Sequence, residues 1–222
     1  MSEYQAVNYD DFAHTFSHSR NAMKWEEIEY FLQKYSDAIN GKKILDIWCG
    51  NGRLLDHFIQ SSCITDIDYF WIDSSQWMIQ EAKNKFHTDD FMVWNMNELK
   101  NLKMKNFESV FFIASFHHLE NIESRIQCLS TLKTLLLPKS FIFMTNWDLQ
   151  SPINKEKYKN NKIKTSKNEF WSEDYFIKIG DFQRFYHSFS LQELEYIFHQ
   201  TWFEILENRL FENERNIVSI IQ

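Results

Sequence analysis

Two short stretches carry residues that could bind a nucleoside. The apolar run 43–47 breaks at a turn that contains Gly50 and Gly52, and Asp73 closes a second apolar run about 20 positions further on. A buried strand followed at once by small residues brings backbone N–H groups up to a ligand at the carboxyl edge of a sheet. A carboxylate at the tip of the next strand can accept both hydroxyls of a ribose. The spacing therefore predicts a site for a ligand that contains a ribose.

Asp73 also has a purely structural interpretation. A helix is predicted to begin near Ser75, and Asp73 could serve as its N-cap. Ser74 and Ser75 could cap that helix equally well, which leaves the ribose role to Asp73. We expect Asp73 to hold the ribose, and the capping role remains the alternative.

Adjacent histidines, His117 and His118, follow a further apolar run. Side chains of neighbouring residues diverge on a strand or a helix, and no third ligand is spaced to help, so we expect no metal site. A structural alternative is that one histidine is packed and hydrogen-bonded while the other meets solvent. A second polar cluster, Gln183 to His187, contains one arginine among aromatic residues.

The turn after the first run resembles motif I of the class I S-adenosylmethionine-dependent methyltransferases, Asp-x-Gly-x-Gly-x-Gly. It stands here as Asp46-Ile47-Trp48-Cys49-Gly50-Asn51-Gly52-Arg53, with Trp48 at the first glycine position. The resemblance implies an α/β, Rossmann-like fold with a seven-stranded, mostly parallel sheet flanked by helices. It also implies S-adenosyl-L-methionine as cofactor and a methyltransferase activity.

The same resemblance assigns candidate cofactor contacts. A leading helix with Tyr9 and Arg20 would fold over the cofactor, although a helix packed on the domain is the plainer interpretation. Asn95 and Met96 stand where the family has an acidic residue and the backbone N–H that contact adenine. Asn95 can still accept through its amide oxygen, but without a charge. The full set of cofactor contacts implied is Tyr9, Arg20, Asp46, Trp48, Cys49, Gly50, Asn51, Gly52, Arg53, Asp73, Ser74, Asn95, Met96, Ile113 and Ser115.

Two segments resemble the tRNA wobble-uridine carboxymethyl methyltransferases: Ile113-Ala114-x-x-His117-His118-Leu119 and the run from Gln183 to Phe189. This subgroup implies methyl-ester formation on a carboxylate, which is already ionised and requires no strong base. Arg184 would clamp the anion. Tyr186, His187 and Asn146 would donate hydrogen bonds, and His117 would border the methyl-transfer site. A small-molecule N- or O-methyltransferase would share every cofactor motif and remains the alternative.

The hydrophobic periodicity predicts the elements that position these residues. Helices are expected at 24–38, 53–60, 76–86, 121–137 and 191–199, the fourth stopped by Pro138. Strands are expected at 43–47, 69–73, 91–94, 108–114 and 141–145. The ranges 203–206 and 216–221 are expected to form a closing antiparallel pair.

Composition bounds the kind of protein. The 222 residues suit one methyltransferase domain, 1–222, with an N-terminal helical lid at 1–40 and a flexible Lys/Asn-rich insertion at 151–180. No apolar run approaches the length of a membrane span, and the three cysteines suit reduced thiols, so we expect a cytoplasmic protein. A net charge of −7 does not attract nucleic acid, so a tRNA partner would need the local lysine patch Lys155–Lys167. The resemblance also allows a small activator subunit.

Glycine is scarce and tryptophan abundant. There are 4 glycines and 8 tryptophans, although an α/β fold uses glycine at several turns. Trp48, Trp71, Trp94 and Trp202 stand where the resembled family has glycine, and Trp77 is a fifth candidate. Some bacteria decode UGA as glycine, whereas other codes read it as tryptophan. We therefore hypothesise that the natural protein has glycine at these positions.

Three other tryptophans fall outside this set. Trp25 and Trp147 match aromatic positions of the family, and Trp171 matches no position of the pattern. A competing interpretation takes every tryptophan as genuine. In that case Trp48 occupies cofactor space and the domain is a degenerate binding module, since an indole is among the largest side chains to accommodate.

Overall fold

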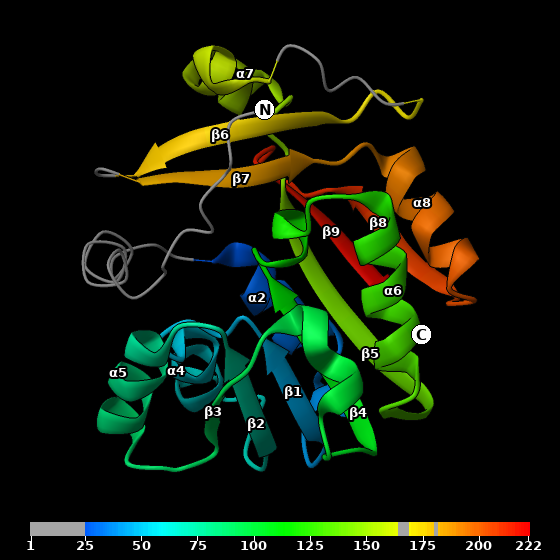
Figure 1. Ribbon diagram of the computed structural model, residues 1–222. Helices are drawn as coiled ribbons and strands as arrows, with labels where there is room; N and C mark the ends of the chain where they lie inside the picture. Colours follow the sequence, from blue (N-terminus) through cyan, green and yellow to red (C-terminus); the bar gives the residue numbers. More distant parts are fainter. Residues whose placement is uncertain (1–24, 164–168, 180–181) are drawn as a thin grey trace.

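The computed structural model describes residues 25–163, 169–179 and 182–222. A seven-stranded sheet with the order β3-β2-β1-β4-β5-β9-β8 lies between two layers of helices (Figure 1). All its neighbouring strands run parallel except at β9, which is antiparallel to both β5 and β8. The predicted Rossmann-like, mostly parallel sheet is confirmed. Its strands are β1 (Lys43–Ile47), β2 (Asp68–Asp73), β3 (Phe91–Val93), β4 (Phe107–Ile113), β5 (Leu136–Trp147), β8 (Ile205–Leu210) and β9 (Asn216–Ile221).

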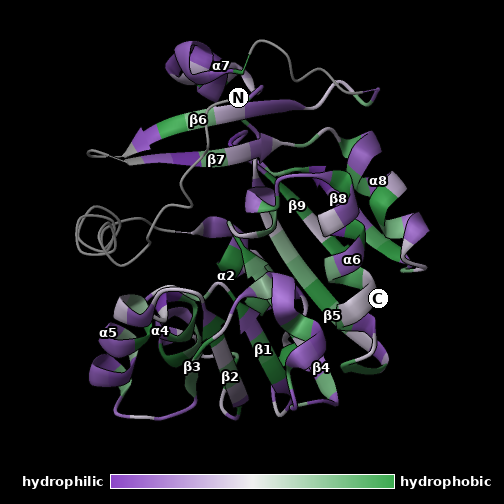
Figure 2. Ribbon diagram, in the orientation of Figure 1, coloured by the Kyte–Doolittle hydropathy of each residue, from purple (hydrophilic) through white to green (hydrophobic). Residues whose placement is uncertain are grey.

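Each buried strand sends alternate side chains into two separate cores. On β1, Leu45 and Ile47 join a core that includes Leu129, whereas Ile44 joins a second core that includes Phe31. Figure 2 shows apolar residues concentrated in the strands and on the inner faces of the helices. The helices are α2 (Glu26–Lys34), α3 (Ser36–Ile39), α4 (Arg53–Gln60), α5 (Gln76–Phe86), η1 (Met96–Asn101), η2 (Phe116–His118), α6 (Ile122–Lys133), α7 (Pro152–Tyr158), η3 (Lys159–Asn161) and α8 (Leu191–Gln200).

Hydroxyl caps define where two of these helices begin. Ser75 Oγ accepts the Met78 N–H at 3.1 Å at the start of α5, and Ser190 Oγ accepts the Glu193 N–H at 3.1 Å at the start of α8. Both caps satisfy backbone donors that have no partner within the helix. Within the part of the chain that the structure describes, no helix has the length and apolarity needed to cross a membrane.

The helix predicted at 121–137 ends earlier than expected. α6 stops at Lys133, and Leu136 already pairs with Phe107 of β4 as the first residue of β5. Pro138 lies in that strand, where the register with β4 shifts and where β9 has not yet begun to pair. A proline lacks an N–H, so it is tolerated at such an unpaired position.

The range 151–180, expected to be a flexible insertion, contains regular structure. Ser151 Oγ caps α7 by accepting the Asn154 N–H at 3.3 Å, with Pro152 in the first turn. β6 (Glu173–Ile179) pairs antiparallel with β7 (Phe182–Ser188) in a separate two-stranded sheet. Tyr175 and Ile177 of β6 are buried in a small core with Leu149 and Tyr186.

A substitution at Gly52 tests the turn that follows β1. Gly52 has a φ of 80°, and an added Cβ would lie 2.6 Å from the Phe86 ring and 3.0 Å from the Phe91 ring. Gly52→Ala combines left-handed strain with overpacking, so we expect a loss of about 2 to 4 kcal/mol in the free energy of unfolding, measured in urea.

Gly41→Ala is the matched control. Gly41 has a φ of 70°, but its nearest neighbour, Asp66 Oδ2, would lie 4.0 Å from the new Cβ. Only the backbone cost applies there, and we expect a loss of about 1 kcal/mol. Equal losses at the two positions would contradict the packing argument for Gly52.

Candidate cofactor and substrate cleft

A cleft, about 880 Å³ with the open solvent at its mouth included, lies at the carboxyl ends of β1, β2, β4 and β5. The β6–β7 hairpin crosses above this edge of the sheet (Figure 1). Ligands in open α/β sheets bind at this edge, because loops and helix N-termini converge there. The predicted site residues that line the cleft are Asp46, Trp48, Cys49, Gly50, Asn51, Arg53, Asp73, Ser74, Ile113, His117, Arg184 and Tyr186.

Asp73 joins the glycine turn to the tip of β2. Its Oδ2 accepts the Gly50 N–H at 2.9 Å, and its Oδ1 accepts the Ser75 N–H at 2.8 Å. The turn and the acidic strand end therefore lie side by side, as the sequence predicts. The capping of α5 falls to Ser75, and Asp73 is left as a carboxylate on the wall of the cleft.

Two ionisable groups of the motif, Asp46 and Cys49, have a raised pKa because they are buried. Burial, followed by the negative charge of Asp73, raises the pKa of Asp46 well above its ordinary value. Burial likewise raises the pKa of the Cys49 thiol, with Asp73 and Asp46 adding to the shift. A thiol is a nucleophile only as thiolate, so Cys49 is not suited to covalent catalysis.

The Trp48 side chain is part of the cleft wall. Its ring centroid lies 5.0 Å from that of His118, and the Arg184 guanidinium lies 5.3 Å from the ring. The backbone at Trp48 has a φ of 64°, a region that residues with a Cβ seldom adopt. The indole thus extends from the glycine turn toward the residues of the hairpin.

His117 and His118, in the segment after β4, also line the cleft. His117 and His118 are only 1% and 8% exposed, which disfavours the structural alternative that one of them meets solvent. His117 Nδ1 accepts the Trp147 N–H at 3.2 Å, and His118 Nδ1 donates to the Phe185 carbonyl at 2.7 Å. His118 thereby connects the loop after β4 to β7, which explains the burial of both rings.

Arg184 and Tyr186 reach the cleft from β7. The Tyr186 ring stacks on Trp147 with centroids 5.0 Å apart, and the Arg184 guanidinium lies 5.6 Å from the Tyr186 ring. Tyr186 is 1% exposed, and its hydroxyl has no hydrogen-bond partner among the described residues. A buried hydroxyl of this kind usually has a partner, so it is a candidate ligand contact.

The part of the chain that forms this cleft matches the model of a known protein family. A family model described as a methyltransferase domain matches residues 16–208 of the chain. The chain belongs to this methyltransferase family. The matched residues include the glycine turn, the acidic end of β2 and most of the seven-stranded sheet.

Two curated relatives match part of this chain. Protein 235L of Invertebrate iridescent virus 6, named as a methyltransferase, is 32% identical over 115 residues, which are 48% of this chain and 42% of the viral protein. The tRNA U34 carboxymethyltransferase of Dichelobacter nodosus is 28% identical over 95 residues, 40% of this chain and 30% of the relative. The chain thus matches less than half the length of either relative.

Solved structures share the fold over nearly the whole chain. A S-adenosylmethionine-dependent methyltransferase from Clostridium acetobutylicum is 15% identical with a TM-score of 0.66, covering 96% of this chain and 98% of the other. A Bacteroides fragilis methyltransferase crystallised with S-adenosyl-L-homocysteine has 16% identity and a TM-score of 0.63, covering 91% and 78%. A Haloferax volcanii methyltransferase, in complex with the Trm112 activator, has 13% identity and a TM-score of 0.63, covering 98% of each chain.

His187 lies outside the cleft lining. Successive side chains of a strand point to opposite faces, so His187 cannot share a face with Tyr186. Its Nδ1 lies 2.6 Å from Asp174 and its Nε2 lies 2.8 Å from Glu193, which in turn accepts from Arg125 at 2.9 Å. Each ring nitrogen of His187 therefore faces a carboxylate oxygen. The network joins the hairpin to α8 and α6.

The remaining predicted residues lie apart from the cleft. Asn146 is fully buried, and its side-chain amide has no hydrogen-bond partner among the described residues; Ser115 is also buried. Asn95 Oδ1 accepts the Asn97 N–H at 2.9 Å, while Met96 packs in the main core. The adenine contacts expected of the last two stay predictions. Gly52 is buried beneath the turn, and Tyr9 and Arg20 fall outside the described residues.

Several lining residues were not among the predicted site residues. Ala114 and Trp147 come directly at or after the ends of β4 and β5, so strand ends alone could have identified them. Trp25 precedes α2, and its ring lies 4.2 Å from the Arg53 guanidinium. Leu54, Met78 and His118 complete this set. Trp25 matches an aromatic position of the resembled family, but its contact with Arg53 of α4 depends on how α2 packs.

The buried network predicts an acid-sensitive stability. Burial would raise the pKa of Glu193, but its hydrogen bond to His187 and the charges of His187 and Arg125 hold it at about 2, below the ordinary 4.5. Stability from this carboxylate is therefore present above pH 4.5 and is lost as the pH falls toward 2. Glu193→Gln should abolish this part of the pH dependence in urea unfolding.

The same variant leaves Arg125 buried without its ionic partner. At pH 7 we expect Glu193→Gln to lose about 3 to 5 kcal/mol in the free energy of unfolding. Glu195→Gln, exposed on the same helix, is the control and should change little. A wild-type pH dependence retained in Glu193→Gln would contradict the network.

Proposed function

We propose that this chain is a S-adenosylmethionine-dependent methyltransferase and that its acceptor is a carboxylate on tRNA. The observation that carries the cofactor part is the pairing of the Gly50 turn with Asp73 on the wall of the cleft. A fold neighbour from Bacteroides fragilis was crystallised with S-adenosyl-L-homocysteine, which supports the same cofactor here.

The residues of the turn suit the polar groups of this cofactor. Asp73 would accept from the ribose hydroxyls, and the backbone of Gly50 and Asn51 would face the amino-acid end. An added Cβ at Gly50 would meet nothing within 4 Å, so this part of the turn leaves room for a ligand. Cys49, Arg53, Ser74 and Ile113 complete the wall. When bound, the cofactor supplies a methyl group on a sulfonium, ready for transfer to a nucleophile.

The hairpin supplies the groups that suit an anionic acceptor. Arg184 brings a permanent positive charge to the cleft, and the Tyr186 hydroxyl and His117 lie beside it. An ionised carboxylate is itself the nucleophile, so positioning and partial desolvation would account for the rate. The relative from Dichelobacter nodosus, named for methylation chemistry on tRNA U34, supports wobble-uridine ester formation as the specific reaction.

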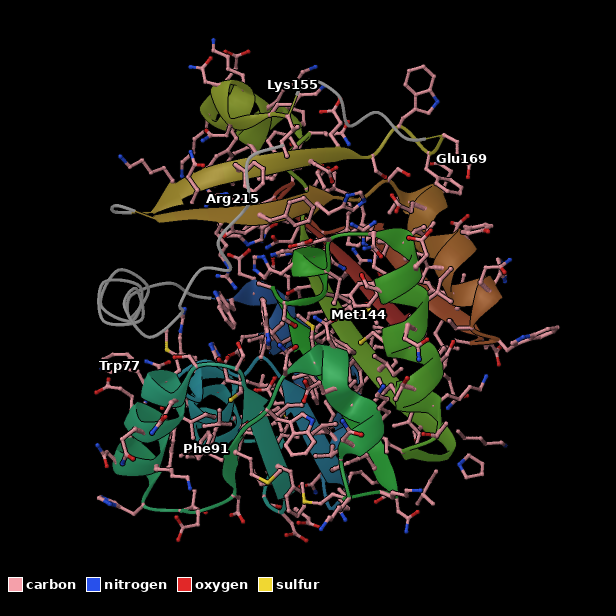
Figure 3. The ribbon with its side chains drawn as sticks, in the orientation of Figure 1. Trp77, Phe91, Met144, Lys155, Glu169 and Arg215 are labelled. Atoms are coloured by element: carbon pink, nitrogen blue, oxygen red, sulfur yellow. The ribbon has the colours of Figure 1, made fainter. Side chains whose placement is uncertain are left out.

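A tRNA would meet the lysines of α7 and η3. Lys155, Lys157 and Lys159 are exposed, and Figure 3 shows Lys155 on α7, beyond the hairpin from the main sheet. Part of this charge is already paired, since Lys159 contacts Glu156 at 2.8 Å and Lys162 pairs with Glu173. This partial neutralisation, with the net charge of −7, favours a small-molecule N- or O-methyltransferase as the second candidate.

Two further proposals depend on the acceptor. The Haloferax volcanii neighbour was solved with an activator protein, which supports a small activator subunit for this chain as well. Methylation of tRNA would also place the protein in the cytoplasm. A degenerate module that only binds is the third candidate, because the Trp48 indole forms part of the cleft wall.

Cofactor affinity tests the role of Asp73. Asp73→Asn removes the charge that would strengthen hydrogen bonds to the ribose, so we expect the Kd for S-adenosyl-L-homocysteine to rise about 10- to 100-fold in calorimetry. Asp68→Asn, exposed at the opposite end of β2, should leave the Kd unchanged. Both measurements are made with Trp48 and with Trp48→Gly, so that a blocked cleft is distinguished from a wrong cofactor. Equal affinities for Asp73→Asn and its parent would rule out the ribose role.

Methyl transfer to bulk tRNA tests the acceptor. With tritiated S-adenosylmethionine, we expect label in tRNA that alkali releases, as an ester requires. Arg184→Ala should abolish this transfer, since it removes the charge that would hold the anion, while S-adenosyl-L-homocysteine affinity is retained. Lys178→Ala removes a charge from an exposed position of β6 and should transfer normally. Alkali-stable label, or label only in small molecules, would favour the second candidate.

A further inference from the structure

Three tryptophans have a backbone conformation that suits glycine. Trp48, Trp171 and Trp202 have φ values of 64°, 63° and 58°. Among the described residues, the glycines with positive φ are Gly41, Gly50 and Gly52, at 70°, 57° and 80°. The left-handed region places the Cβ of an L-residue against the following carbonyl, so a bulky residue there is an outlier. The three tryptophans therefore share the backbone geometry of the glycines. Five smaller or polar residues also have positive φ: His87, Asn106, Ala114, Lys139 and Glu214.

Trp202 occupies the glycine position of a helix end. α8 ends with Thr201 as its C-cap, so Trp202 is the next residue. The Trp202 N–H donates to the His199 carbonyl at 3.1 Å, and the Phe203 N–H donates to the Phe198 carbonyl at 3.1 Å. These two bonds form a Schellman motif, in which the left-handed residue is usually glycine. The Trp202 side chain is 86% exposed, so packing does not hold it in this conformation.

Trp171 also combines a positive φ with an exposed side chain, but it does not follow a helix. It precedes β6, its side chain is 69% exposed, and its carbonyl accepts from Gln150 Nε2 at 3.2 Å. Because the sequence pattern does not place Trp171, its φ of 63° is an observation independent of any family resemblance. Trp48 is the third case, in the turn where its own N–H donates to the Ile72 carbonyl at 2.8 Å.

We propose that positions 48, 171 and 202 are glycine positions, and that the natural protein carries glycine there because the organism decodes UGA as glycine. At position 48, glycine removes an indole from the cleft wall next to His118 and Arg184. The backbone geometry does not support glycine at Trp71 or Trp94, because neither has a positive φ. Trp71 is buried in β2 and stacks on Phe91 with ring centroids 4.0 Å apart. Trp94 Nε1 donates to the Glu98 carbonyl at 3.2 Å.

Paired substitutions isolate the backbone effect. Alanine and glycine both remove the indole, but only alanine keeps a Cβ at positive φ. We expect the Gly variant at 48, 171 or 202 to unfold about 2 to 4 °C above the Ala variant at the same position. At Trp94, which lacks a positive φ, the order should reverse because glycine gains more freedom on unfolding. Ala variants as stable as Gly variants at 171 and 202 would overturn the proposal.

The codons of the gene and the mass of peptides from the native protein test whether glycine is encoded at these three positions. We expect UGA codons at 48, 171 and 202, UGG codons at 25 and 147, and glycine at the first three positions in peptides of the native protein by mass spectrometry. A UGG codon at any of the three overturns the assignment of that position. This outcome is independent of the cofactor. If codons and stabilities agree but Trp48→Gly gains no affinity for S-adenosyl-L-homocysteine, then the methyl-donor proposal fails and the glycine assignment stands.

Discussion

The structure of the cleft depends on one carboxylate. Asp73 receives the Gly50 N–H on one oxygen and the Ser75 N–H on the other, so a single side chain holds the glycine turn and the start of α5 together. Hydrogen bonds to an ionised acceptor are stronger than neutral ones, and this one is only 8% exposed. Because β1 and β2 are neighbouring parallel strands that end at this point, these two hydrogen bonds fix the wall of the cleft that the glycine turn and Asp73 form. Gly52 then allows the close packing of the turn on Phe86 and Phe91.

The upper wall of the cleft is held by a different kind of interaction. The β6–β7 hairpin is a separate sheet, and it is anchored to the helical layer by buried charges rather than by the main core. His187 pairs with Glu193, which pairs with Arg125, and each of these side chains is at most 4% exposed. Strand alternation then places Arg184 and Tyr186 on the opposite face, at the cleft. The charge network thus positions the residues that could meet an acceptor.

Trp48 connects the glycine turn to the residues on the hairpin side of the cleft. It belongs to the turn, and its indole contacts His118 and Arg184. A side chain of that size on a left-handed residue carries backbone strain and also fills ligand space. The same residue therefore links the conformational argument about glycine to the proposed cofactor site.

The sequence by itself determined the parts of this protein that depend on local patterns. The strand, turn and helix from Lys43 to Gln60, the acidic end of β2 and the helix from Gln76 to Phe86 follow from periodicity, caps and glycine, each within a few neighbouring residues. These elements also predict that Asp73 lies beside the turn, because adjacent parallel strands end at one edge. The glycine deficit was visible in the composition, and the family pattern located some of its positions.

Only the tertiary structure decided what depends on distant pairing. The end of α6 at Lys133 follows from the pairing of Leu136 with β4, and the strand conformation of β6 follows from its pairing with β7. That hairpin register turns Arg184 toward the cleft and His187 away from it, a distinction that residue types alone do not make. The positive φ of Trp171 was likewise invisible in the sequence. In each case the deciding contact joins residues far apart in the chain, and local propensity contains no information about such contacts.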